Sequence, residues 1–97
     1  MIPLELSKEA DADLADILYY GLLAFGADTA EAYLKSFEEA FDLIRRHPMI
    51  GAEIDIVRPP IRSLSHRSHR ILYDVFTEQV VVQRVLHAAM DVETSLG

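Results

Sequence analysis

Residues 70–87 have the sequence RILYDVFTEQVVVQRVLH, and this stretch predicts a β-hairpin. Two runs rich in β-branched and aromatic residues, Arg70–Phe76 and Val80–Leu86, are separated by three polar residues. The valines at 80–82 do not alternate with polar residues, so we expect their strand to be central, with helices on one face and another cover, such as a partner, on the other. A further strand is expected at Ile61–Ser65, which gives a three-stranded antiparallel arrangement.

The N-terminal half predicts a short strand followed by a helix. The strand is expected at Leu4–Leu6, and the Ser7 hydroxyl can then accept a hydrogen bond from an amide of the first helical turn. Apolar residues recur after it at steps of three and four, which is typical of a helix with one buried face. Gly21 lies on this apolar stripe, and a close approach by a neighbouring helix would explain a residue without a side chain there.

A second helix is expected directly after the first. Gly26 can adopt a positive φ and cap the first helix, while Asp28 and Glu31 have the spacing of a capping box for the second. So short a link predicts an antiparallel helical hairpin. Pro48 should end the second helix, and the segment 49–60, with its pair of adjacent prolines, should be an irregular crossing to the sheet.

The length of 97 residues allows one hydrophobic core, so residues 1–97 are expected to form a single domain. The predicted fold class is α+β, a helical hairpin packed on a small antiparallel sheet in the order βααβββ. The chain has no cysteine, which excludes disulfides and thiolate metal sites. The first residues, MIPLELSKEA, have neither the basic nor the long apolar region of a signal peptide, and no stretch approaches the ~20 apolar residues of a membrane span, so we expect a cytoplasmic protein that does not enter membranes.

Charge is distributed unevenly along the chain, although the net charge is −7. Residues 1–42 hold ten acids and two lysines, a balance of −8. Residues 43–90 hold seven arginines and four acids, a balance of +3, together with all four histidines. A polyanion could therefore contact only the second half.

The arginines and histidines on or beside the predicted strands are the candidate site residues. Such arginines can bind a phosphate or a partner's carboxylate, or they can pair with Asp74, Asp91 or a helix C-terminus and serve only the fold. His66 and His69 have no second local pair of ligands, which does not favour a metal site, and no cofactor is expected. The candidates for binding a target or partner are Arg62, His69, Arg70, Tyr73, Arg84, His87 and Asp91.

Enzyme chemistry has limited support in these residues. His87 or His69, combined with an arginine and Tyr73, could serve as general acid and base in a metal-free ribonuclease, and His87 is the better of the two. A histidine at a strand end equally serves as a hydrogen-bonded structural residue. The sequence contains no phosphate-binding loop, nucleophile elbow or zinc-protease motif, so it gives no support to nucleotide hydrolysis or ordinary hydrolase chemistry.

Residues 84–91, RVLHAAMD, form the most distinctive motif of the chain. Weaker fragments precede it in a fixed order: Ala10, Asp13-Leu14, Ile17, Tyr33, His47-Pro48, Gly51, Arg62-Ser63 and His69–Tyr73. Together they resemble the ParE branch of the RelE/ParE toxin superfamily over nearly the whole chain, and residues 84–91 look like its C-terminal RVLHxxMD signature. The resemblance implies the fold already expected from the residues.

The resemblance also implies a function. ParE-like proteins are toxins of type II toxin-antitoxin systems, which arrest growth and stabilise plasmids, and characterised members inhibit DNA gyrase rather than act as enzymes. A small antitoxin is implied as the partner; it neutralises the toxin in a hetero-oligomer and alone contacts operator DNA. Gyrase would be the target.

Two alternatives stay open. RelE-branch relatives cut ribosome-bound messenger RNA without a metal, and in that case Arg70, Arg84 and His87 would be the catalytic residues. The chain has lysine only at Lys8 and Lys35, both in the acidic half, which favours the ParE interpretation because phosphate attraction dominates RNA binding. The other alternative is a relative without toxicity that only binds the antitoxin.

Overall fold

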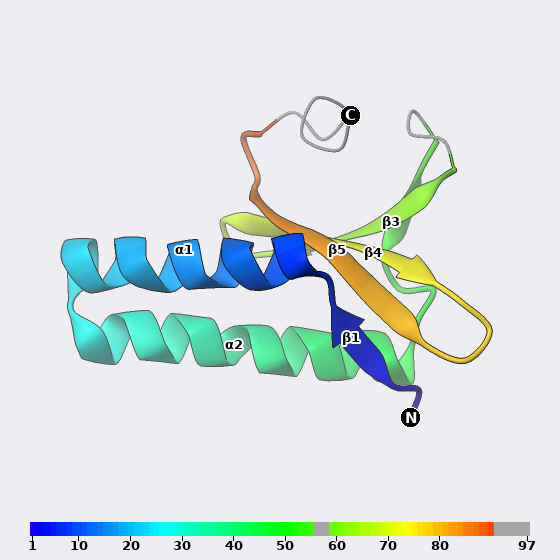
Figure 1. Ribbon diagram of the computed structural model, residues 1–97, viewed down its shortest axis with the longest axis horizontal. Coiled ribbons are helices and arrows are strands. Elements are labelled where there is room, and N and C mark those ends of the chain that lie inside the picture. The colour runs from blue at the N-terminus through cyan, green and yellow to red at the C-terminus, as the bar shows by residue number, and fades with distance from the viewer. Residues whose placement is uncertain (56–58, 91–97) are drawn as a thin grey trace.

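The computed structural model describes residues 1–55 and 59–90 and has a helical hairpin beside a twisted sheet (Figure 1). This arrangement confirms the α+β fold class. Viewed along its shortest axis, the hairpin extends well beyond the sheet (Figure 1). The elements are β1 (Leu4–Leu6), α1 (Lys8–Phe25), α2 (Ala27–Arg46), β2 (Ala52–Ile54), β3 (Ile61–His66), β4 (His69–Val75) and β5 (Val80–His87).

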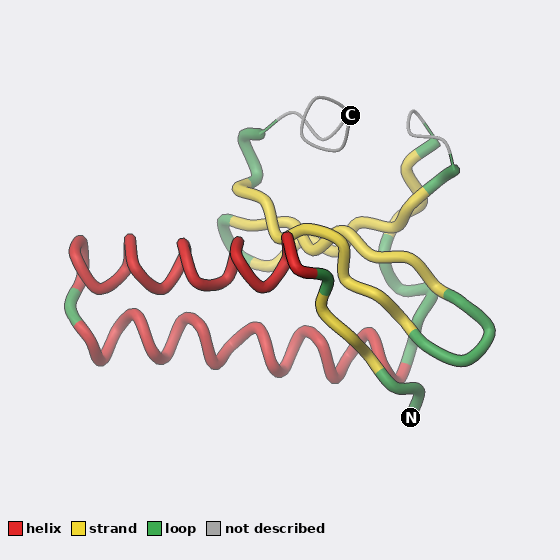
Figure 2. The backbone as a smooth tube through the Cα atoms, viewed as in Figure 1, coloured by secondary structure: helices red, strands yellow, loops and turns green. Residues whose placement is uncertain are grey.

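The described residues form a five-stranded sheet with the order β1-β5-β4-β3-β2 (Figure 2). The expected antiparallel arrangement holds for β3, β4 and β5, but β1 pairs with β5 in parallel. The backbone of Val80 donates to Pro3 and that of Ser7 donates to Val82, so the chain ends of β1 are tied to β5. The position of β5 inside the sheet, with Val80 and Val82 fully buried, confirms that the valine run is a central strand.

The segment 49–60 was expected to be irregular, and the structure corrects this for its first part. Residues Ala52–Ile54 form β2, an edge strand antiparallel to β3. The Arg62 guanidinium of β3 donates to the carbonyl oxygens of Met49 and Gly51, at 3.2 and 2.7 Å, and so holds the approach to β2. A strand of three residues that depends on a distant side chain leaves little local pattern in the sequence.

Tyr73 of β4 fixes the same segment from inside the core. Its hydroxyl donates to the Pro48 carbonyl at 2.7 Å and accepts from the Gly51 amide at 2.8 Å. The approach is close, because a Cβ on Gly51 would lie 2.7 Å from the Tyr73 hydroxyl oxygen. Burial raises the pKa of the Tyr73 phenol, so the hydroxyl keeps the proton that it donates.

The helical hairpin begins as expected but its second helix starts differently. The Ala10 amide donates to the Ser7 hydroxyl at 2.9 Å, which confirms the N-cap. A Cβ on Gly21 would lie 3.0 Å from that of Ala30, which confirms the close approach of the two helices. The capping box at Asp28 is not formed: Gly26, with a φ of 87°, turns the chain directly into α2, which therefore starts before Asp28 without a side-chain cap.

The core lies between the hairpin and one face of the sheet. Aromatic and aliphatic residues of α2, including Phe37 and Ile44, pack on Tyr73, Val82 and Val85. A smaller cluster lies on the other face of the sheet and consists of Ile61, Leu72 and Leu86.

A β-bulge in β5 changes which side chains face the helices. Leu72 pairs with Arg84 while the next residue, Tyr73, pairs with Val82, so Gln83 is extra on β5. Val82 and Val85 therefore both reach the main core, although strict alternation would put them on opposite faces.

Substitution of Tyr73 by phenylalanine should lower the free energy of unfolding by about 1–3 kcal/mol, because it leaves the Gly51 amide and Pro48 carbonyl without their partner. Urea denaturation measures this. The matched control is Tyr19→Phe on α1, where the side chain is 66% exposed and the change should stay within about 0.5 kcal/mol. Equal losses in the two variants would contradict the structural role of Tyr73.

Candidate functional site

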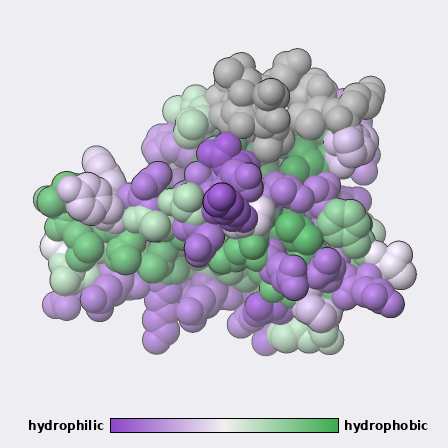
Figure 3. All heavy atoms as spheres, viewed as in Figure 1, coloured by the Kyte–Doolittle hydropathy of each residue, from purple (hydrophilic) through white to green (hydrophobic). Residues whose placement is uncertain are grey.

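A cleft of about 1070 Å³ lies between α1, the N-terminal half of α2, the β3–β4 turn and the end of β5. Its lining is mostly apolar. Tyr20 and Phe25, which are 67% and 65% exposed, form an edge-to-face pair with ring centroids 6.4 Å apart on the hairpin side. Apolar side chains also gather in a band along the hairpin, beside hydrophilic ones (Figure 3). Exposed aromatic surface of this kind is typical of a binding site for another protein.

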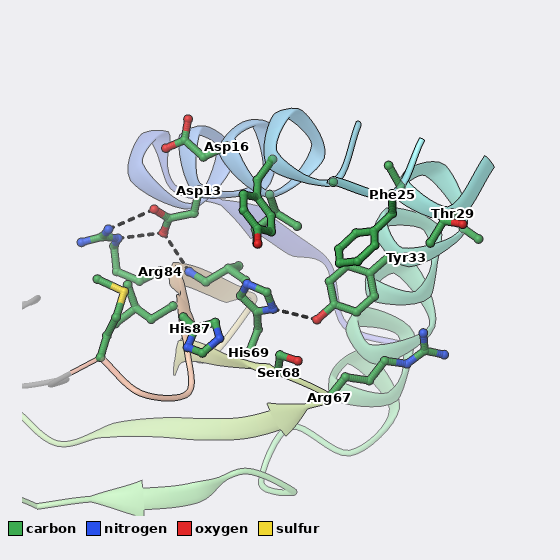
Figure 4. Close-up of a pocket in the computed structure, with 18 of the residues that line it drawn as sticks. Asp13, Asp16, Phe25, Thr29, Tyr33, Arg67, Ser68, His69, Arg84 and His87 are labelled. Carbon is green, nitrogen blue, oxygen red and sulfur yellow. Dashed lines mark hydrogen bonds and ion pairs between the residues drawn. The ribbon is translucent and has the colours of Figure 1, made fainter. Parts of the chain in front are cut away.

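One wall of the cleft is fixed by an ion pair between α1 and β5 (Figure 4). The Arg84 guanidinium donates to both oxygens of the Asp13 carboxylate, at 2.8 and 2.9 Å. The backbone amide of Val85 donates to the same carboxylate at 2.9 Å. The hydrogen bond that Arg84 donates to Asp13 raises the pKa of Arg84, so the guanidinium stays charged.

Two histidines of the sheet are bonded to α2, and one of them, His69, lines the other side of the cleft. His69 Nδ1 lies 2.7 Å from the Tyr33 hydroxyl, and the two side chains point toward one another (Figure 4). His66 Nε2 lies 2.7 Å from the Ser36 hydroxyl oxygen. Since the Ser36 hydroxyl donates its proton to the Tyr33 carbonyl, His66 Nε2 must be the donor to Ser36.

The histidines also influence one another. The rings of His69 and His87 meet edge to face with centroids 5.5 Å apart. Burial lowers the pKa of His69, and the nearby His87 and His66 lower it further. Burial also lowers the pKa of His66, with Arg67 adding to the effect and Glu39 opposing it. Both rings are therefore neutral at pH 7 in the free chain.

Arg67, on the β3–β4 turn, places a cation in the lining of the cleft. Arg67 has a φ of 53°, in the left-handed region, and is exposed. Its guanidinium lies 5.7 Å from the centroid of the Tyr33 ring, within cation–π range. The cleft thus combines an apolar body with a cationic end.

The structure brings three of the predicted site residues to the cleft, namely His69, Arg84 and His87. Arg84 is engaged there by Asp13, which was not among its expected partners; Asp74 instead accepts from Gln83 at 3.0 Å. The candidate Asp91 lies outside the described residues.

Three other predicted site residues lie away from the cleft. Arg62 and Tyr73 bond to the segment that leads into β2, as described above. Arg70 pairs with Leu86 across the sheet and shares its face, which is the face turned away from the helices. Of the residues proposed together for a ribonuclease, Arg84 and His87 line the cleft and Arg70 does not.

Sequence reasoning missed Tyr33 and Arg67 as cleft residues. Tyr33 was named among the fragments that resemble the family; it packs against the main core, and its place in the sequence gave no sign of a bond to His69. Among the described residues, no three histidine, cysteine or carboxylate side chains form a possible metal site. No described helix is both long and apolar enough to cross a membrane.

Residues 4–92 match the family model for the ParE toxin of the type II toxin-antitoxin system, parDE. The chain belongs to the ParE toxin family. It is 40% identical over 92 residues to Toxin ParE1 of Mycobacterium tuberculosis, covering 94% of each chain. It is 33% identical over 97 residues to Toxin ParE1 of Caulobacter vibrioides, covering both chains fully.

A solved structure of the chromosomal ParDE TA system from P. aeruginosa shares the ParE fold of this chain, with a TM-score of 0.78. The match covers 90% of this chain and 96% of that chain, at 19% sequence identity. The family resemblance of the RVLHAAMD motif and its companions is thereby confirmed, and the chain is a ParE-type toxin of a type II toxin-antitoxin system.

The lowered pKa values of His66 and His69 predict the pH dependence of stability. As pH falls below about 6.5, the unfolded chain takes up protons at these residues while the folded chain resists, so the free energy of unfolding decreases. Above that pH both states are neutral there and the two histidines contribute no slope. We expect the decrease in urea denaturation series between about pH 7.5 and 5.5.

The variant that carries His66→Gln and His69→Gln should have a shallower decrease over this range. His47→Gln is the matched control, because His47 is exposed at the C-cap of α2, and it should keep the slope of the unmodified chain. An unchanged slope in the double variant would contradict the assignment.

Proposed function

We propose that this ParE-family toxin arrests growth by inhibiting DNA gyrase and that a small antitoxin holds it inactive. The observation that carries the proposal is family membership over residues 4–92, with 40% identity to a Toxin ParE1 along 94% of each chain. Both relatives named above are called Toxin ParE1. We further propose that the protein acts in the cytoplasm, where gyrase and the antitoxin would meet it.

The arrangement of basic residues supports inhibition by binding over RNA cleavage. Arg84 has its guanidinium engaged by Asp13, and Arg70 lies on the sheet face away from the cleft. The cleft is also lined by Asp16 and Asp28, which would repel a polyanion. We therefore keep the metal-independent ribonuclease only as the second candidate.

The cleft supports an antitoxin as the partner. An amphipathic segment of the antitoxin would bury its apolar side chains between Tyr20, Phe25 and the end of β5. An acidic segment would also suit the positive balance of residues 43–90, so the association rate should fall with added salt. Operator DNA would be contacted only through the antitoxin, in a hetero-oligomer.

The partner can be found by growth rescue. Induction of this chain should arrest growth, and co-expression of fragments from the source genome should restore it where a fragment encodes the antitoxin. If induction leaves growth unchanged while such a partner still binds tightly, the chain is a relative that has lost toxicity.

The gyrase assignment predicts the outcome of a supercoiling assay. Increasing amounts of the folded protein should abolish supercoiling by purified gyrase and trap cleaved DNA. The control is Ala40→Asp, which places a charge in the main core, where Ala40 is 7% exposed, and should leave gyrase fully active because the chain does not fold.

Full supercoiling at a large molar excess of folded protein would contradict the assignment. Mapping of transcript ends after induction would then test the second candidate, because cuts at codon positions in translated messages are produced only by the ribosome-dependent nuclease.

A further inference from the structure

The Tyr33–His69 contact can hold a proton in either of two places without breaking. With His69 neutral and its proton on Nε2, the Tyr33 hydroxyl donates to His69 Nδ1; with His69 protonated, Nδ1 donates to the Tyr33 hydroxyl oxygen. The contact of 2.7 Å is therefore satisfied in both states. His69 can therefore accept a proton in the folded chain and keep its hydrogen bond to Tyr33 of α2.

The two neighbouring histidines are held differently. The Ala89 amide donates to His87 Nδ1 at 3.2 Å, and this hydrogen bond would be lost if Nδ1 carried a proton. His66 Nε2 donates to Ser36 in either protonation state, but His66 does not line the cleft. His69 is thus the histidine that both lines the cleft and keeps its hydrogen bond whether it is neutral or protonated.

The residues around His69 on β3, on β5 and on the β3–β4 turn include three basic side chains. Arg67 lies on the turn before it, and His66 and His87 approach its ring from β3 and β5. The acids nearby are otherwise placed: Glu39 of α2 acts on His66, and Asp13 is bound to Arg84. Two further carboxylates line the hairpin side of the cleft, Asp16 and Asp28.

We propose that Arg67 and His69 receive an acidic side chain of the antitoxin, next to an apolar side chain seated by Tyr20 and Phe25, and that His69 takes up a proton when the complex forms. This inference rests on the proposed antitoxin partner and names the chemistry that recognises it. The charge of Arg67 and the apolar lining beside it suit an apolar segment that places a single carboxylate at the β3–β4 turn, whereas Asp16 and Asp28 on the hairpin side would oppose further negative charge.

Proton uptake follows from the electrostatics of the site. In the free chain, burial and the neighbouring histidines lower the pKa of His69, so its ring is neutral at pH 7. A carboxylate brought next to the ring favours the charged form and offsets both effects. Because formation of the complex takes up a proton, the affinity must increase as the pH falls.

The experiment is calorimetric titration of this chain with the partner that rescues growth, between pH 7.5 and 6.0. With one linked proton, Kd should decrease by up to about tenfold per pH unit. Titration at one pH in two buffers of different ionisation enthalpy should register net proton uptake. His69→Gln should remove both effects, while His47→Gln, at the exposed C-cap of α2, should keep them.

A second variant tests the proposal independently, in case His69→Gln does not fold. Arg67→Asn lies on the exposed turn, where asparagine tolerates the φ of 53°, and it should weaken binding and its salt dependence while keeping the proton uptake. A pH-independent Kd in the unmodified chain, or unchanged binding in Arg67→Asn, would overturn the inference and leave the antitoxin proposal standing. Absence of binding at every pH would overturn both.

Discussion

The ion pair between Asp13 of α1 and Arg84 of β5 is the constraint on which the arrangement of helices and sheet depends. Its carboxylate accepts from the Arg84 guanidinium and from the Val85 amide, and so joins residues 71 and 72 positions apart in the chain. β1 pairs with β5 only as far as Val82, so the edge of β5 at Val85 is open to α1, and the Asp13 carboxylate accepts from the Val85 amide there. A network of charged hydrogen bonds in a partly buried position restricts α1 to one place on β5.

The cleft follows from this placement. With α1 held at β5, the end of the hairpin that carries the helix–helix link extends past the sheet (Figure 1), and the exposed Tyr20 and Phe25 line the cleft. The bond from Tyr33 to His69 closes the other wall. An acidic chain thus presents an apolar cleft with a cationic mouth, a combination that suits a toxin controlled by a protein partner.

Much of the fold could be predicted from local signals, because the cap at Ser7, the glycine at the helix crossing and the strands β3 to β5 depend on nearby residues. The parallel pairing of β1 and the short strand β2 could not, since distant backbone and side-chain contacts hold them. In the site, His69 and His87 were identified because they belong to the arginines and histidines on or beside the predicted strands. Asp13 and Tyr33 were missed because each meets its partner only after the helices pack on the sheet.

A double-mutant cycle tests the central claim, that the Asp13–Arg84 pair joins the hairpin to the sheet. The variants are Asp13→Asn, which keeps an acceptor for Val85, Arg84→Gln, and the two combined. Because the two side chains are 14% and 24% exposed, we expect a coupling free energy of about 1–3 kcal/mol in urea denaturation. Losses that add to within about 0.3 kcal/mol would contradict the claim.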